Sequence, residues 1–186
     1  MAHSKHRRTE HTLIHNPGYD FRRLLNWISE ADANNPDLPF APYFLPVIGI
    51  LAACCAIEGY VNMVGQKVDP SWAKFDKGPM PIRDRISRVY YCVGKKPLFS
   101  KGVWNKALSL FKMRNELVHP KYVQKAEKRK IKTIFQTANK KYPPSDSKRI
   151  AEGAIDTLLK DTNLQTLKNV YQISTYAGPP RARASR

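Results

Sequence analysis

The stretch FLPVIGILAACCAI, residues 44–57, decides the fold class of this 186-residue chain. It contains almost nothing polar, and we expect it to form most of a helix from about Val47 to Gln66. A membrane-spanning helix needs about 20 apolar residues, whereas this stretch is broken by Pro46 and closed by Glu58. It therefore predicts a buried core helix, with a membrane-associated helical protein as the less favoured alternative.

Outward from this stretch, apolar residues keep a helical spacing, and no Asn-Gly or Asp-Gly hairpin signal occurs. Pro81 suits a first-turn position, and Pro120 ends the helix that precedes it. The sequence thus predicts an all-α fold, a compact bundle of four to five main helices. The further helices are expected over about residues 20–33, 81–93, 101–118, 122–140 and 145–171.

The two ends of the chain differ from this middle part. We expect residues 1–16 to form a flexible basic leader, since they lack the apolar core of a secretory signal, and residues 176–186 to form a disordered basic tail. The helical domain is assigned to residues 17–175. The three cysteines, Cys54, Cys55 and Cys92, lack the spacing of a disulfide framework or zinc site. We interpret them as reduced core residues, which favours a cytoplasmic location.

The chain is strongly basic, with a formal net charge of +17 and a pI near 9.9. Such a charge favours polyanionic partners such as RNA, DNA or anionic lipid, but it identifies no reaction. Ten of the basic residues lie between residues 121 and 149, against Glu127 and Asp146. The ordinary interpretation is that this strip is a solvated surface. The functional interpretation is that it guides the phosphate backbone of a nucleic acid towards the protein. The residues we assign to nucleic-acid binding are Lys121, Lys125, Lys128, Arg129, Lys130 and Lys132.

Polar side chains interrupt the apolar face of the expected helix over residues 101–118. Residues three and four apart share a lane on a helix, which places Arg114 with Leu110 and Leu117, and Asn115 with Phe111 and Val118. Both polar residues are therefore expected on the buried side. A buried arginine needs a carboxylate, a phosphate or several carbonyls to compensate its desolvation.

His119 follows on the same helix, and Pro120 fixes it at the carbonyl-rich end. Such an end favours the protonated imidazole and can place the change between the two charge states of the histidine near neutral pH. Arg114, Asn115 and His119 are thus expected to face one pocket. The alternative is a structural ion pair with a helix-capping histidine.

Residues 114–119, RNELVH, resemble the Rx4-6H signature of HEPN domains, small helical bundles that include many metal-independent endoribonucleases of toxin–antitoxin and defence systems. Asn115 matches that family's preference for Asn, Asp or His after the arginine. Residues 53–62, ACCAIEGYVN, are similar to the early helix of several HEPN families, where small residues precede Glu, an aromatic residue and Asn. The resemblance spans residues 47–171.

The resemblance implies a mechanism and a set of partners. His119 would act as general base on the ribose 2′-hydroxyl or as general acid on the leaving oxygen. Arg114 would hold the scissile phosphate, and Asn115 would orient His119 or the substrate. The family's site commonly lies between two subunits, so a homodimer acting on RNA is implied, with an antitoxin protein as a further partner. No metal or cofactor is required.

Three supporting candidates surround this motif. Glu58 and Asn62 lie one turn apart in the most apolar helix, and we infer that Glu58 pairs with Arg114 or lies beside it. The alternative is a structural hydrogen bond to a neighbouring helix. Tyr122 corresponds to a tyrosine that is nucleotidylated in one HEPN toxin group, although two residues rather than one separate it here from His119. The alternative is a packing aromatic.

Two functions follow from these features. The leading hypothesis is a metal-independent endoribonuclease of HEPN type, acting as a toxin or defence effector on single-stranded or tRNA-type RNA. The alternative is a non-catalytic HEPN-like module that binds nucleic acid or a partner protein through its basic surface. Phosphate-binding loops, nucleophile elbows and His-Glu-x-x-His metal sites do not occur in the sequence.

Overall fold

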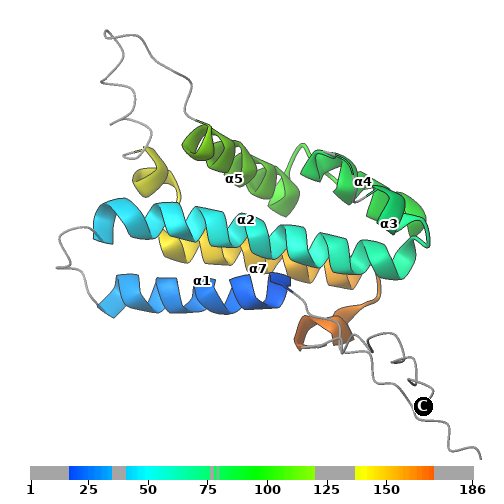
Figure 1. The fold of residues 1–186 in the computed structure, drawn as a ribbon, viewed down its shortest axis with the longest axis horizontal. Coiled ribbons are helices and arrows are strands. Elements are labelled where there is room, and N and C mark those ends of the chain that lie inside the picture. The colour runs from blue at the N-terminus through cyan, green and yellow to red at the C-terminus, as the bar shows by residue number, and fades with distance from the viewer. Residues whose placement is uncertain (1–16, 35–40, 76–77, 79, 120–136, 170–186) are drawn as a thin grey trace, which may run out of the picture.

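The computed structural model describes residues 17–34, 41–75, 78, 80–119 and 137–169 (Figure 1). All regular structure in these residues is helical, which confirms the all-α prediction. The elements are α1 (Pro17–Asn34), α2 (Ala41–Val68), α3 (Trp72–Phe75), α4 (Ile82–Cys92), α5 (Gly102–Val118), α7 (Pro144–Asp161) and the 3₁₀ helix η2 (Gln165–Asn169).

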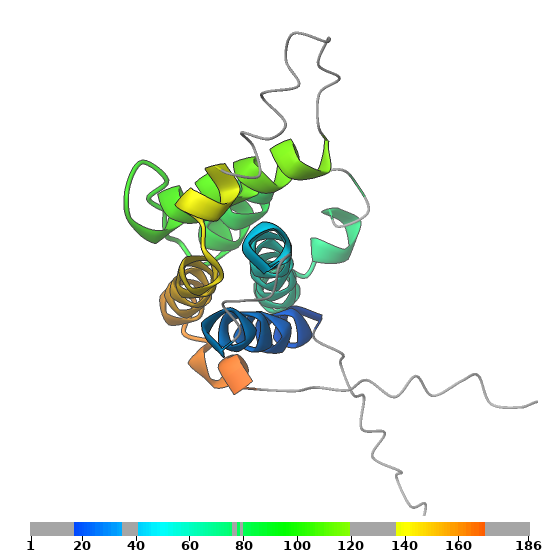
Figure 2. The same cartoon turned by 90° about the vertical axis from the view of Figure 1, so that its left-hand side faces the viewer.

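Helix α2 occupies the centre of the bundle. Figure 2 shows α1, α5 and α7 arranged around it, and α3 and α4 also contact it. This position follows from its sequence, because a helix that is apolar nearly all round must be covered on several sides. Its buried residues include Ala53, Ala56, Tyr60, Val61 and Val64.

Helix α2 begins earlier than expected. Its first residue is Ala41, so Pro46 lies inside the helix rather than before it. A proline in the second turn removes only one backbone hydrogen bond, and the packing around α2 tolerates this loss. The expectation that the apolar segment is too short to cross a membrane was therefore wrong, since Phe44–Val68 is long and apolar enough by length and composition. In the most apolar 18-residue part of this segment, 56% is nevertheless buried inside the bundle, as in a core helix.

Glycine permits two close approaches to α2. A Cβ atom on Gly59 would lie 2.4 Å from the Cα atom of Gly18, where α1 crosses α2. A Cβ atom on Gly65 would lie 2.3 Å from the indole of Trp72, a residue that is only 2% exposed. Both glycines therefore set the distance between α2 and its neighbours.

A buried hydrogen-bond network joins α4, α5 and α7. The Trp104 indole N–H donates to the Tyr90 hydroxyl at 3.0 Å, and this hydroxyl donates to Asp161 Oδ2 at 2.6 Å. The two rings meet edge to face with centroids 6.0 Å apart. Lys95 adds a 2.6 Å bond from its Nζ to the Asp161 carbonyl oxygen. The network fixes the first turn of α5 and so orients the whole helix.

Helix α7 ends ten residues before the expected end at residue 171. Asn163 adopts a left-handed backbone with φ of 59°, and its N–H bonds to the Lys160 carbonyl at 3.2 Å. The next N–H, of Leu164, bonds to the Leu159 carbonyl at 2.8 Å. This pair of bonds is the Schellman motif that ends many helices, here with asparagine in place of glycine.

Several expectations fall on residues that the structure does not describe. The basic leader 1–16 and the tail 176–186 belong here, as does most of the expected helix over 122–140. Residues 137–141 are described and helical, and Ala138 and Tyr142 belong to the hydrophobic core.

Candidate functional site

Helix α5 presents its apolar face to α2 and α7. Its buried residues are Trp104, Ala107, Leu110, Phe111 and Met113. Arg114 continues this face one turn before the end of the helix and is half-buried, with 31% of its side chain exposed. The expected interruption of an apolar face by Arg114 is therefore present.

Glu58 of α2 is the acidic partner of Arg114. The Nη2 atom of Arg114 lies 3.6 Å from Oε1 of Glu58, whose side chain is 33% exposed. This contact confirms the expected proximity of the two residues. Charge-assisted hydrogen bonds are shorter, about 2.7–2.9 Å, so the pair is in electrostatic contact without a close hydrogen bond.

The remaining surroundings of Arg114 are largely apolar. Its guanidinium carbon lies 5.5 Å from the centre of the Phe111 ring, within range of a cation–π interaction. Its Nε atom is buried and has no hydrogen-bond partner. The side chain thus retains donor capacity for an anionic ligand.

Asn62 interacts with α4 rather than with Arg114. Its side-chain oxygen accepts a 2.9 Å hydrogen bond from Nη1 of Arg85. The Nε atom of Arg85 donates to the Met80 carbonyl oxygen at 3.2 Å. Sequence reasoning missed Arg85, because it lies on a helix with two other arginines and nothing local distinguishes it.

Asn115 and His119 lie on the exposed side of α5, and so does Val118, which is 48% exposed. The expectation that Asn115 is buried beside Arg114 was wrong. In the lane of Ala107, Leu110 and Arg114, burial extends partly to Arg114. In the neighbouring lane, burial ends after Phe111, and Asn115 and Val118 are exposed. Arg114 is thus half-buried against α2, whereas Asn115 and His119 face solvent in the part of the chain that the structure describes.

The position of His119 at the end of α5 is as expected. It is the residue that follows Val118, and its N–H bonds to the Asn115 carbonyl at 3.0 Å. Its backbone angles, φ −119° and ψ 65°, are not helical. The imidazole is therefore held at the helix terminus and open to solvent.

Two thiols lie in the electrostatic field of the Arg114–Glu58 pair. Burial raises the pKa of both Cys54 and Cys55, and Glu58 raises it further while Arg114 opposes the change. Both are therefore protonated thiols rather than nucleophiles at neutral pH. Cys92 is exposed, so the expectation of three core cysteines was wrong for this one.

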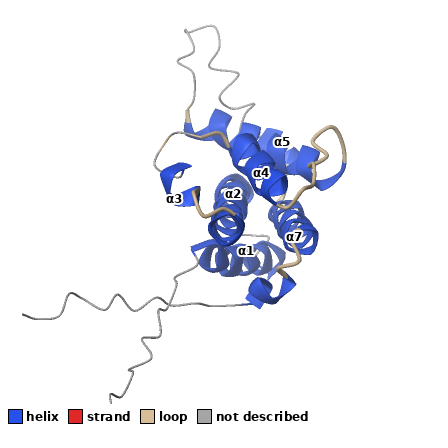
Figure 3. Cartoon of the chain, turned by 90° about the vertical axis from the view of Figure 1, so that its right-hand side faces the viewer, coloured by secondary structure: helices blue, strands red, loops and turns tan. Residues whose placement is uncertain are grey.

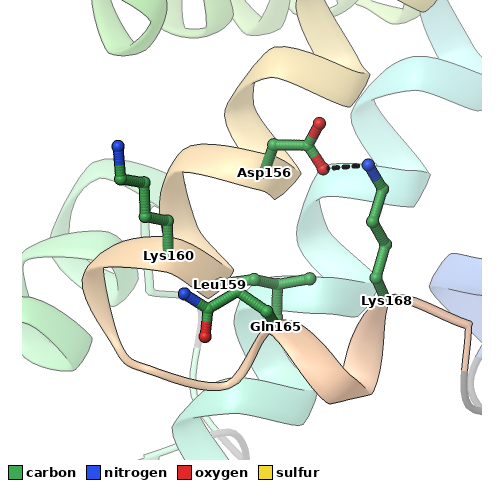
Figure 4. Close-up of a pocket in the computed structure, with 5 residues that line it drawn as sticks. All are labelled: Asp156, Leu159, Lys160, Gln165 and Lys168. Atoms are coloured by element: carbon green, nitrogen blue, oxygen red, sulfur yellow. Dashed lines mark ion pairs between the residues drawn. The ribbon is translucent and has the colours of Figure 1, made fainter.

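A shallow pocket of about 340 Å³ lies elsewhere, where α7 meets η2 (Figure 4). Asp156 and Lys168 form a 2.6 Å ion pair at its edge. The Lys168 carbonyl accepts hydrogen bonds from Tyr60 and Arg22, which brace η2 against α1 and α2. No residue of the Rx4-6H-like motif lines this pocket.

Other expected site residues lie outside the part of the chain that the structure describes. These are Tyr122 and the basic residues Lys121, Lys125, Lys128, Arg129, Lys130 and Lys132. Within the described ranges, no group of three or more His, Cys, Asp or Glu side chains is placed to hold a metal ion.

Comparison with known proteins identifies no relative: no family model, no curated protein and no solved structure matches the chain.

Proposed function

We propose that this chain is a metal-independent endoribonuclease of the HEPN type. The observation that carries the proposal is the half-buried Arg114, which lies against Glu58 and Phe111 one turn before a helix end that exposes His119. An arginine guanidinium can bind a phosphate through parallel hydrogen bonds, and a histidine side chain can act as a general base or acid. The proposed setting is the cytoplasm, with a role as toxin or defence effector and no membrane partner.

The proposed reaction needs only groups of the protein and the RNA. His119 removes the proton from a ribose 2′-hydroxyl, whose oxygen then attacks the adjacent phosphorus. Arg114 stabilises the charge that develops on the phosphate oxygens. The bond to the 5′-oxygen of the next nucleotide breaks, and that oxygen takes up a proton from water or from the protonated His119, which returns to its neutral form. The products are a 2′,3′-cyclic phosphate end and a free 5′-hydroxyl end.

The proposal includes a homodimer, since Asn115 and His119 are exposed in the single chain. A second copy across this end of α5 would exclude water and bring two motifs into one cleft. An antitoxin protein that covers the same end would block the site.

The test is incubation of the purified chain with mixed RNA in EDTA. We expect cleavage to 2′,3′-cyclic phosphate ends, with the rate reduced about 100-fold or more in Arg114→Ala and His119→Ala. Lys112→Ala, which removes an exposed charge from the same helix, is the matched control and should cleave normally. No cleavage by the wild type, or equal cleavage by all four proteins, would contradict the proposal.

The exposure of Asn115 and His119 also supports a second candidate function, a non-catalytic module that binds nucleic acid or a partner protein. In that case the Arg114–Glu58 pair stabilises the α2–α5 contact, and the basic surface alone does the binding. RNA binding that weakens steeply with salt, without any cleavage, is the result that distinguishes this candidate.

A further inference from the structure

Exposed apolar side chains gather on the hairpin of α1 and α2. Within the described residues, seven large hydrophobic side chains are exposed, and those on this hairpin are Leu24, Trp27, Phe44 and Ile48. Trp27 is 63% exposed, whereas the other two tryptophans, Trp72 and Trp104, are 2% and 3% exposed. Tryptophan is enriched at the centres of protein interfaces, where its large ring leaves water. Helix α1 is therefore a candidate interaction surface.

Trp27 belongs to a lane of α1 that points away from the bundle. On the other side of the helix, Leu25 and Ile28 are fully buried. Arg23, Trp27 and Glu30 have the spacing i, i+4 and i+7, which places them on one face of a helix. All three are exposed. This outer face of α1 thus presents a basic, an aromatic and an acidic side chain in that order along the chain.

The charge of α1 distinguishes the kinds of partner that could bind it. The helix holds two basic residues, Arg22 and Arg23, against three acidic ones, Asp20, Glu30 and Asp32, so its net charge is −1. The whole chain, in contrast, has a net charge of +17. RNA and anionic membranes are attracted by positive charge and would favour other surfaces of the molecule. The outer face of α1 therefore suits a protein partner.

The order of the side chains makes the outer face complementary to a second copy of itself. Arg23 precedes Trp27 by four residues and Glu30 follows it by three, so an antiparallel copy presents glutamate opposite arginine and arginine opposite glutamate. Within the described part of the chain, neither charged side chain forms an ion pair. Contact of residue 23 with residue 30, and of residue 30 with residue 23, is the pattern of an isologous interface, which closes with two copies.

We propose that the outer face of α1 binds α1 of a second copy in antiparallel orientation, with the two Trp27 rings beside the twofold axis. Leu24 lies about 60° round the helix from Trp27 and is 38% exposed, so it extends the apolar centre of the contact. The two ion pairs at the ends of this centre fix the direction and the register of the helices.

This contact is separate from the dimer proposed above at the end of α5. Figures 2 and 3 show α1 and α5 on opposite sides of α2. The two contacts therefore use different surfaces of the chain. Variants of α1 test this inference whether or not the chain cleaves RNA.

Sedimentation velocity of the full chain at several protein concentrations measures the association. We expect the mass to rise with concentration, and Trp27→Ala to raise the dissociation constant of the contact at least about 30-fold, as for a central tryptophan of an interface. Tyr91→Ala is the matched control, because it removes an aromatic ring that is 78% exposed on α4. A wild type that stays monomeric, or equal association of all three proteins, would overturn the inference.

Exchange of the two charges tests whether the face recognises itself. Arg23→Glu and Glu30→Arg each place like charges opposite one another at both ends of the pair, so we expect each to raise the dissociation constant about tenfold. The double variant Arg23→Glu/Glu30→Arg restores opposite charges and should associate as the wild type does. A mixture of the two single variants should recover in the same way, through mixed pairs. Weakened single variants without recovery in either case would overturn the antiparallel pairing.

Tryptophan fluorescence locates the contact on α1. Trp72 and Trp104 are already buried in the single chain, so a change of emission on association reports on Trp27. We expect the emission to move to shorter wavelength as the protein concentration rises, and this shift to be absent in Trp27→Phe. Circular dichroism checks that each variant keeps the helical content of the wild type. Association without a shift in emission, or a shift that persists in Trp27→Phe, would overturn the inference.

Discussion

Replacement of Tyr90 by phenylalanine tests whether the buried network orients α5. The variant keeps the ring that packs edge to face on Trp104 but removes the hydroxyl between the Trp104 indole and Asp161. The indole N–H then loses its acceptor in a site where Trp104 is only 3% exposed. Asp161 is half-buried, so water can replace the lost donor there.

The expected loss of stability follows from the difference between the buried Trp104 indole and the half-buried Asp161. A buried donor left without a partner costs about 1–3 kcal/mol, and the carboxylate of Asp161 adds little because solvent reaches it. We therefore expect Tyr90→Phe to lower the free energy of unfolding by about 2 kcal/mol. For a chain of this size, this corresponds to a fall in Tm of about 4–8 °C.

Chemical and thermal unfolding followed by far-UV circular dichroism measure the effect. Tyr91→Phe is the matched control, since this neighbouring tyrosine is 78% exposed and should change stability by less than about 0.5 kcal/mol. Burial and the bond to Asp161 raise the pKa of Tyr90. The contribution of its hydroxyl is therefore complete below the unfolded pKa of about 10 and lost above the folded one. Equal stability of the two variants at neutral pH would refute the role assigned to the network.

Two further predictions concern the contacts of α2 with α3 and α4. Gly65→Ala should lower the free energy of unfolding by about 1–3 kcal/mol through overpacking, because the new Cβ would meet the buried Trp72 indole. Gly78→Ala serves as the control, since a Cβ atom there would meet nothing within 4 Å. Hydrogen bonds from Arg88 and Ser71 lower the pKa of Asp69 to about 2. Its stabilising contribution is therefore present above the unfolded pKa of about 3.9 and lost as pH falls towards 2. Unfolding curves over this pH range should show that the stability of Asp69→Asn is less sensitive to acid than that of the wild type. Identical profiles of stability against pH for the two proteins would contradict this role of Asp69.

Features that depend on neighbouring residues were predictable from the sequence. The 3.6-residue periodicity gave the helical class, and Pro120 together with the last apolar residue placed the end of α5 at Val118. Gly94 follows α4 with φ of 69°, a left-handed backbone that favours glycine just after a helix. The Arg114–Glu58 contact was also predictable, because both residues interrupt apolar lanes and a carboxylate is one of the groups that compensate a buried arginine.

Features that depend on the placement of other helices were not predictable. Asn115 shares a lane with Phe111, yet Asn115 is exposed and Phe111 is buried, and the helical spacing does not distinguish them. Arg85 meets Asn62, 23 residues earlier in the chain, only because α4 packs against α2.

The sequence by itself therefore determined the helices, their apolar faces and the need for a partner at Arg114. Local spacing and side-chain chemistry suffice for these, since they act over one or two helical turns. The tertiary structure alone decided which lanes of α5 are covered, and that Arg85 of α4 meets Asn62 of α2. These outcomes depend on contacts between residues far apart in the chain, which periodicity along one helix does not encode.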